Sequence, residues 1–275
     1  MRRKLLLVPS LMLLCLVLIP DRAPEVHSQP ATPPVEEYTD DGVSLPSAAN
    51  FAKLAQSDPT AFLEMCMRRY RREVKTLSGE MVKQERVDGK VHPAETLDFW
   101  FREEPYSVMI KWKKGARQAA ASMYVKGENN DKIVALPTLL KWAGKVVERD
   151  VDGREAHACS RYLMNESSML QGTERTWAAW KAAKQKGTLQ VEYLGLAPVA
   201  DLGGRPCHVL KRTCKPTEED GIATVEVAVD ADTWLQVGST LADANGQLIG
   251  KYQFPKVVIN PELPADQFTK ETLKK

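Results

Sequence analysis

The chain has 275 residues, with 38 Lys or Arg against 36 Asp or Glu, so its formal charge is +2. An excess of two positive charges is too small to neutralise the phosphates of a nucleic acid, so nucleic-acid binding is not expected. Hydrophobic residues make up 43% of the chain, which is close to the share of an ordinary globular protein.

The N-terminus has the three parts of an export signal. Basic residues at positions 2–4 precede an apolar run over residues 5–19, and the segment Val26–Ser28 offers small residues to a signal peptidase. We therefore expect a signal peptide over residues 1–28 and a mature protein in the periplasm or cell envelope. The apolar run is shorter than the ~20 residues of a membrane-spanning helix. An uncleaved membrane anchor and a lipid anchor at Cys15 are the alternatives.

Composition divides the rest of the chain into two parts. Residues 29–48 are rich in proline and acidic residues and almost lack large apolar ones, so they cannot bury enough surface to offset the entropy of ordering. This segment is expected to be a flexible linker. Residues 49–275 show no second change in composition and are expected to form a single domain.

The first predicted helix begins at Asp58, an N-cap followed by proline at the first helical position. Apolar residues then recur at helical spacing and are expected to face the core. This stripe comprises Leu63, Met67, Tyr70 and Val74.

Alternating apolar residues next predict antiparallel strands. The run from Leu77 to Val87 ends at Asp88-Gly89, a strong hairpin signal. The strands that follow place large side chains on one face, namely Leu97, Phe99 and Phe101, then Val108, Ile110 and Trp112, then Met123 and Val125. A later hairpin at Asp152-Gly153 is expected to join a strand over Val146–Asp150 to another over Glu155–Cys159.

A second helix is predicted to begin at the capping box of Ser168 and Gln171 and to end at Gly187, which can close its C-terminus. Its inward face would carry Met169, Thr173, Trp177 and Trp180. Strands resume over 189–193 and 207–211, and a C-terminal meander follows over 224–230, 235–237, 250–254 and 257–259. Asx and Gly residues between these runs supply the turns.

Together these elements predict an α+β architecture. One strongly curved, mostly antiparallel sheet would form an incomplete barrel, with helices covering its concave face. The order of the C-terminal meander resembles bacterial lipoprotein carriers of the LolA-like fold. Other motifs resemble a bacterial family known only as an exported domain of unknown function; they are Lys83–Arg86 with Asp88-Gly89, Phe101–Val108, Trp112, Tyr124–Gly127 with Asn129, Gly204–Cys207, and Asp230 with Leu235. The chain departs from that family at Leu139–Trp142. The resemblance implies a fold and an exported location, and little chemistry.

Sequence motifs for catalysis are missing. The chain has no Gly-x-Ser-x-Gly elbow, no phosphate-binding glycine loop and no His-Glu-x-x-His. His157 and Cys159 could meet Cys207 and His208 on neighbouring strands and bind a metal. However, Cys207 and His208 would point to opposite faces of one strand, so no metal and no cofactor are expected.

Four cysteines follow the signal, at positions 66, 159, 207 and 214. An even number in an exported protein permits disulfides. Cys207 and Cys214 are seven residues apart and cannot pair within one strand. Cys159 with Cys207 is the candidate disulfide, and buried free thiols are the alternative.

These observations predict a non-enzymatic extracytoplasmic protein that binds lipid or acyl chains in an apolar cavity, as a lipid or lipoprotein carrier does. Its partners would be a hydrophobic or acylated ligand, a lipoprotein among them, with transient contact to the membrane or to envelope proteins. Two alternatives remain open. One is an envelope interaction module with a filled core. The other is a hydrolase or metal-dependent enzyme whose site the sequence spacing does not reveal, and it would need His157, Cys159 and His208 clustered around a cleft. The candidate cavity residues are Leu97, Phe99, Phe101, Ile110, Trp112, Trp177 and Trp180.

Overall fold

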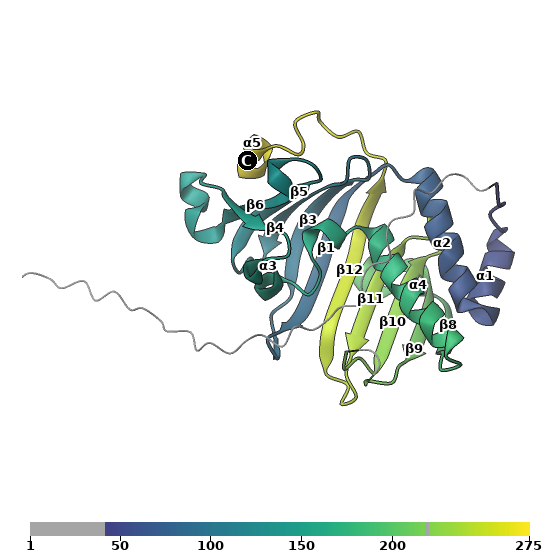
Figure 1. Ribbon diagram of the computed structural model, residues 1–275. Helices are drawn as coiled ribbons and strands as arrows, with labels where there is room; N and C mark the ends of the chain where they lie inside the picture. The colour runs from purple at the N-terminus through teal and green to yellow at the C-terminus, as the bar shows by residue number, and fades with distance from the viewer. Residues whose placement is uncertain (1–41, 218–219) are drawn as a thin grey trace, which may run out of the picture. The chain divides into compact units, whose positions relative to one another are not determined.

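Two helices open the part of the chain that the structure describes, which comprises residues 42–217 and 220–275 of a computed structural model (Figure 1). The expected signal peptide and most of the expected linker lie outside these residues. Helix α1 (Ala48–Ser57) begins after Ser47, whose side chain accepts a hydrogen bond from the Asn50 N–H. Helix α2 (Pro59–Glu73) begins after Asp58, whose carboxylate accepts one from the Ala61 N–H. The predicted start of α2 is therefore confirmed, and its apolar stripe is buried.

One antiparallel sheet of twelve strands follows. The strands of the first half are β1 (Thr76–Val87), β2 (Lys90–Val91), β3 (Glu95–Arg102), β4 (Ser107–Lys114), β5 (Ala119–Val125), β6 (Lys132–Pro137) and β7 (Val147–Asp150). Those of the second half are β8 (Gln190–Val199), β9 (Arg205–Thr213), β10 (Thr224–Asp230), β11 (Gln236–Ala242) and β12 (Leu248–Ile259). Short 3₁₀ turns interrupt the connections at η1 (Asn129–Asp131), η2 (Thr138–Ala143), η3 (Met164–Glu166) and η4 (Ala200–Leu202).

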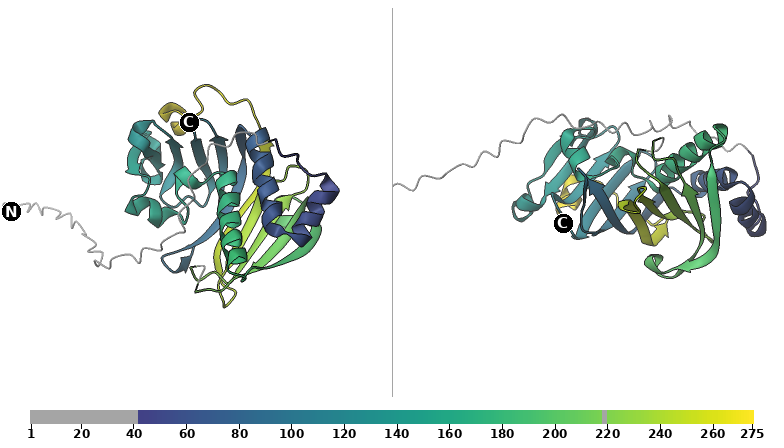
Figure 2. Two further views of the ribbon diagram at one scale, coloured as in Figure 1. Left: turned by 45° about the vertical axis from the view of Figure 1, so that its right-hand side comes forward. Right: turned by 90° about the horizontal axis from the view of Figure 1, so that it is seen from below.

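The sheet consists of two meanders joined at their middle. Its strand order is β7-β6-β5-β4-β3-β1-β12-β11-β10-β9-β8, and β2 pairs with β1 alone. The first meander runs outward from β1 to the β7 edge, and the second returns from the β8 edge to β12, which pairs with β1. Because β7 and β8 are both edges, the sheet is not closed. The predicted fold class, an open and curved antiparallel sheet with added helices, is confirmed (Figure 2).

The connection between the two edge strands crosses one face of the sheet. It contains α3 (Arg154–Cys159) and α4 (Met169–Gln185). Helix α4 has the predicted capping box at Ser168 and Gln171, and Gly187 follows its end with a φ of 68°. Helix α1 contacts α2, and α2 contacts α4. The three helices lie over the second meander (Figures 1 and 2).

On the opposite face of the sheet, the C-terminal segment covers strands of the first meander. There, Phe268 and Leu273, which follow β12, pack on Met109, Met123 and Val134. Leu273 belongs to the short helix α5 (Lys270–Lys274). Strand β5 is therefore buried on both faces, whereas β3 keeps a strict alternation of buried and half-buried residues.

One predicted strand is wrong. Residues Arg154–Cys159 form helix α3 after Gly153, so β7 has no hairpin partner at Asp152-Gly153. The segment Glu155–Cys159 contains two alanines and no β-branched residue, and these favour a helical turn over a strand. Among the described residues, no helix combines the length and the hydropathy that crossing a membrane requires.

Candidate binding cleft

Two apolar clusters meet the helix-covered face, and the seven predicted cavity residues are divided between them. We call the first the cleft-side cluster; its buried members include Tyr70, Val74, Leu77, Leu97, Phe99, Phe101, Val108, Leu235, Val237 and Phe254. Ile110 and Trp112 pack against it while half-buried. Leu97, Phe99 and Phe101 are 0 to 4% exposed, so neighbouring side chains fill the space around them.

The second, the helix-side cluster, holds the two tryptophans of α4. Its buried members are Phe51, Ala55, Phe62, Leu63, Cys66, Trp180, Leu210, Val227, Val229 and Trp234. Trp180 is 1% exposed, whereas Trp177 is half-buried with the Lys181 Nζ 4.3 Å from its ring centre. The structure therefore does not bring Trp177 and Trp180 together with Phe99 and Phe101.

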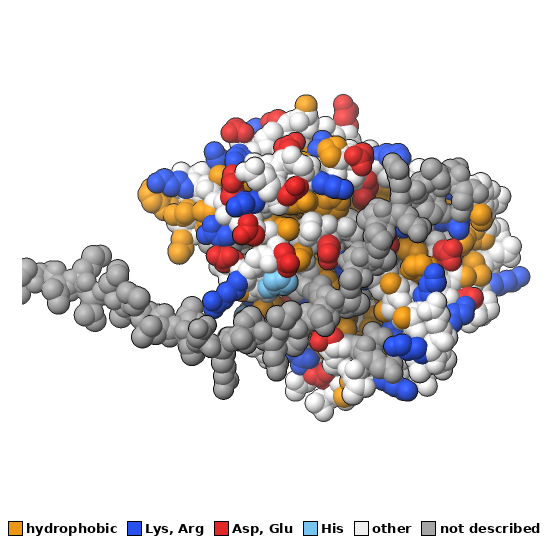
Figure 3. Space-filling model, viewed as in Figure 1, with side chains coloured by type: hydrophobic (Ala, Val, Ile, Leu, Met, Phe, Trp, Pro, Cys, Tyr) orange, Lys and Arg blue, Asp and Glu red, His pale blue; other side chains and the backbone are white. Residues whose placement is uncertain are grey.

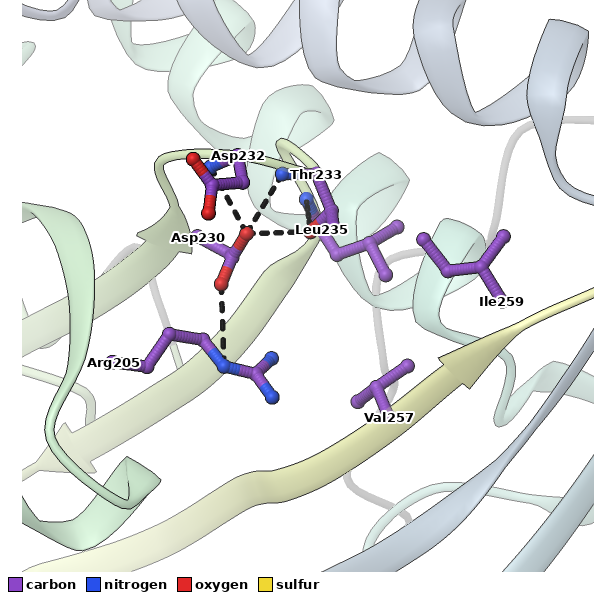
Figure 4. A pocket seen from close by; sticks show the side chains of 7 residues that line it. All are labelled: Arg205, Asp230, Asp232, Thr233, Leu235, Val257 and Ile259. Atoms are coloured by element: carbon purple, nitrogen blue, oxygen red, sulfur yellow. Dashed lines mark hydrogen bonds and ion pairs between the residues drawn. The ribbon is translucent and has the colours of Figure 1, made fainter.

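A cleft with a cavity of about 240 Å³ opens within the second meander, between the end of β12 and the β10–β11 turn (Figure 4). It arises from unequal strand lengths. Strand β12 pairs with β1 as far as Ile259, whereas its pairing with β11 reaches only from Leu248 to Gln253. The end of β12 therefore runs past the β10–β11 turn without pairing to it. The lining residues are Arg205, Asp230, Asp232, Thr233, Leu235, Val257 and Ile259.

One wall of the cleft is polar. The Asp230 Oδ1 accepts hydrogen bonds from the Asp232 N–H (3.1 Å), the Thr233 N–H (2.7 Å) and the Thr233 hydroxyl (2.8 Å), which is an Asx turn. Its Oδ2 lies 3.2 Å from the Arg205 Nε. Asp230 is buried and its two oxygens are occupied, while the terminal nitrogens of the Arg205 guanidinium extend away from Asp230 (Figure 4).

The opposite wall is apolar and continues into the cleft-side cluster. Val257 and Ile259 pack against that cluster, and Leu235 belongs to it. Gly79 of β1 lies between Val257 and Phe99 in the sheet. A Cβ at position 79 would lie 1.9 Å from the Lys256 carbonyl oxygen and 3.1 Å from the Phe99 ring. Glycine is thus required for the close approach that joins the cleft wall to Phe99.

A buried charge network lies on the same face and was not predicted as a site. The Lys83 Nζ is 3.1 Å from Glu85 and 3.6 Å from Glu95, and all three residues are buried. Glu95 also accepts hydrogen bonds from the Trp112 indole (2.7 Å) and from the Arg117 Nε (2.9 Å). Period-two alternation from Leu77 places Lys83 and Glu85 on the covered face, so the sequence does contain the signal.

The network fastens the crossover segment that follows α3. The Glu85 Oε1 accepts from the Tyr252 hydroxyl (2.8 Å), the Ser160 hydroxyl (3.2 Å) and the Arg161 N–H (3.2 Å). Burial alone would raise the pKa of the Glu85 carboxyl, but the charge of Lys83 and these hydrogen bonds hold the pKa below its ordinary value. Glu85 is therefore a carboxylate that binds a loop to the sheet.

The residues that the alternative enzyme would need do not come together. His157 is half-exposed and its Nε2 lies 2.6 Å from Asp152, whereas His208 is buried beside Phe51 and Phe62. Burial raises the pKa of the Cys159 thiol. In the described part of the chain, no three His, Cys, Asp or Glu side chains are grouped to hold a metal ion.

The predicted disulfide of Cys159 and Cys207 is absent from the described residues, in which both are free thiols. The Cys159 Sγ donates a hydrogen bond to Gln118, immediately before β5, whereas Cys207 belongs to β9. Six strands separate β5 from β9 in the sheet order. At about 4.8 Å per strand the sulfurs are far beyond disulfide reach.

The family model for a protein of unknown function, DUF1571, matches residues 74–273, so the chain belongs to that family. No curated protein matches the chain at a significant level. These residues comprise the whole sheet and both crossover helices, which confirms the family resemblance read from the motifs.

Solved structures with a similar arrangement share little sequence. The MucB of Pseudomonas aeruginosa, in its complex with MucA, is 20% identical, with a TM-score of 0.45, and the match covers 78% of this chain and 61% of that one. The chain thus spans less than two thirds of that MucB chain. The Mycobacterium tuberculosis lipoprotein LppX is 11% identical with a TM-score of 0.41, and the match covers 76% of this chain and 100% of that one. A lipoprotein-sorting protein domain from Vibrio parahaemolyticus is 12% identical with a TM-score of 0.35, over 78% of this chain and 98% of that one.

Proposed function

We propose that this DUF1571 protein is a non-enzymatic binding module that takes an anionic amphiphile, such as a long-chain carboxylate or a lysophospholipid, in the cleft beside β12. The observation that carries the proposal is the lining of the cleft. One wall carries the Arg205 guanidinium with its partner Asp230 and the exposed Asp232, and the other wall is apolar and continuous with the cleft-side cluster. An amphiphile has the same two parts, a charged head and an apolar chain.

Arg205 supplies the site for the head. A guanidinium binds carboxylates and phosphates through two parallel hydrogen bonds, and its charge does not depend on pH in the working range. Its Nε is held by Asp230, its Nη2 donates a hydrogen bond of 3.4 Å to the Pro255 carbonyl oxygen, and the guanidinium points toward Val257 (Figure 4). Asp230 fixes the direction of the guanidinium and has its own oxygens occupied by the turn at Asp232 and Thr233.

Leu235, Val257 and Ile259 supply the site for the chain. The cavity of about 240 Å³ is below the roughly 300–1,000 Å³ of pockets for drug-sized ligands. It therefore accommodates a head and the first part of a chain. Each further methylene that enters the cleft-side cluster gains ~0.8 kcal/mol, and it must displace a packed side chain such as Ile110 or Trp112. We expect affinity to rise with chain length and then to level off.

Export belongs to the same proposal. The basic start, apolar run and small-residue segment of residues 1–28 would direct the domain across a membrane. A carrier or sensor of amphiphiles would then act in the cell envelope.

The test is calorimetry of the folded protein with carboxylates of four, eight, twelve and sixteen carbons and with a lysophospholipid. We expect micromolar binding of the longer chains and at least a tenfold loss in Arg205→Met. Arg149→Met is the matched control, because Arg149 is a half-exposed arginine on β7, away from the cleft, and should bind like the wild type. Flat titrations with every amphiphile would overturn the proposal and favour an interaction module with a filled core.

A further inference from the structure

We propose that the tip of the β6–β7 hairpin, residues 138–146, docks on the surface of an anionic lipid bilayer. This surface lies at the β7 edge of the sheet, whereas the cleft is built from β9, β10, β12 and the β10–β11 turn. The proposal therefore does not depend on the cleft.

Two large apolar side chains at the tip are almost completely exposed. Leu139 is 86% exposed and Trp142 is 88% exposed, and the next large apolar side chain on the described surface, Leu196, is 55% exposed. Both belong to η2, a 3₁₀ helix, in which residues three apart lie on the same side. Leu139 and Trp142 thus form one apolar edge that faces solvent.

The charges of the tip match an anionic surface. Residues 137–147 contain Lys141 and Lys145 and no carboxylate. Both lysines are exposed. Glu148, the first acid beyond the tip, lies 2.8 Å from the Lys270 Nζ, so its charge is compensated. Figure 3 shows hydrophobic side chains next to basic ones at this end of the molecule.

The composition of the tip favours a bilayer over a protein partner. Tryptophan prefers the level of the lipid headgroups, and each lysine near an anionic leaflet adds to the attraction. The backbone lets the tip project from the sheet, because Gly144, with a φ of 58°, ends η2 and turns the chain back into β7. Two side chains and two lysines are far fewer than the ~20–30 residues a side of a standard protein interface.

The test is flotation of the protein, purified from cells that export it, with vesicles of mixed phosphatidylcholine and phosphatidylglycerol. We expect the double variant Leu139→Ala/Trp142→Ala to lose at least tenfold in partitioning. The matched control is Leu194→Ala/Leu196→Ala, two exposed leucines on the opposite edge strand β8, which should partition like the wild type. Partitioning should weaken severalfold on vesicles of phosphatidylcholine alone and at high salt.

A second measurement places the tip in the lipid. Brominated lipids should quench the fluorescence of the wild type more strongly than that of Trp142→Phe. Because both tip residues are solvent-exposed, the variants should melt like the wild type, which separates lost docking from lost folding. Equal partitioning of the tip variant and the wild type would overturn the proposal. So would sedimentation showing a dimer that the tip substitutions abolish, without any binding to vesicles.

Discussion

The helix-side cluster and the part of the cleft-side cluster around Phe99 share the helix-covered face of one sheet, yet the two clusters are closed in different ways. Helices α1, α2 and α4 seal the helix-side cluster, where Phe51 stacks on Phe62 and on Trp234 with ring centres 4.3 and 3.8 Å apart. The cleft-side cluster ends at the stretch of β12 that pairs with β1 but not with β11, where Val257 and Ile259 are half-buried. The difference shows that the cover on a sheet face, and not the face itself, decides which part of the core stays open.

The largest expected loss of stability is on substitution of Trp180. Because Trp180 is 1% exposed in the sealed cluster, Trp180→Ala should lower the free energy of unfolding by ~3–5 kcal/mol, as lost transfer and cavity terms add. Trp177→Ala, on the same helix but half-buried, should lower it by about 1 kcal/mol or less. Denaturant titration of both variants measures this difference. Equal losses would show that the two tryptophans share one environment and would remove the distinction between sealed and open regions.

The sequence predicts which residues share a face better than it predicts what covers them. The alternation of Leu97, Phe99 and Phe101 and the caps at Asp58 and Ser168 are local signals, and the structure confirms them. The assignment of Trp177 to the same surface as Phe99 required knowing where α4 lies. That position follows from the connection between the two edge strands, which no local pattern specifies.

The cleft escaped prediction for a similar reason. Gly204–Cys207, Asp230 and Leu235 were recognised as motifs, but their convergence depends on β12 continuing past the end of β11. A register of this kind is set by bulges and strand ends and not by hydrophobic periodicity. The segment Glu155–Cys159 was predicted to be a strand because a turn signal preceded it, although its own residues favour a helix.

The buried charge network offers a second contrast, between two glutamates of β1. Glu85→Gln should lower the free energy of unfolding by about 3 kcal/mol, because it leaves Lys83 with an incomplete set of buried partners. Glu80→Gln is the control, since its partner Lys113 is half-exposed, and should cost about 0–1 kcal/mol. Denaturant titration at neutral pH measures both.

The difference in free energy of unfolding between the wild type and Glu85→Gln should depend on pH, because the pKa of Glu85 is lowered in the folded state. A carboxyl whose pKa is lower in the folded state stabilises the protein above its unfolded pKa, about 4.5, and this stabilisation is lost as the pH falls through the folded value. The gap between the wild type and Glu85→Gln should therefore narrow below about pH 4.5. A gap that stays constant down to pH 3 would show that Glu85 is not held as a carboxylate.

The smallest expected effect concerns the interaction between the start of α2 and α4, the two helices that cover the helix-side cluster. Burial raises the pKa of Asp58, but hydrogen bonds from Lys184, Thr60 and the Ala61 N–H outweigh it and lower the pKa from 3.8 to about 2. Asp58→Ala removes both the N-cap and the link to Lys184 and should cost about 1 kcal/mol. Asp58→Asn keeps a capping oxygen and should cost less.

Because the folded pKa of Asp58 is lowered, the difference in free energy of unfolding between wild type and Asp58→Ala should be full above about pH 4 and shrink as the pH falls toward 2. Denaturant titrations at pH 6, 4 and 3 measure this, and equal costs for the two variants would mean that the ion pair, and not the cap, joins the helices.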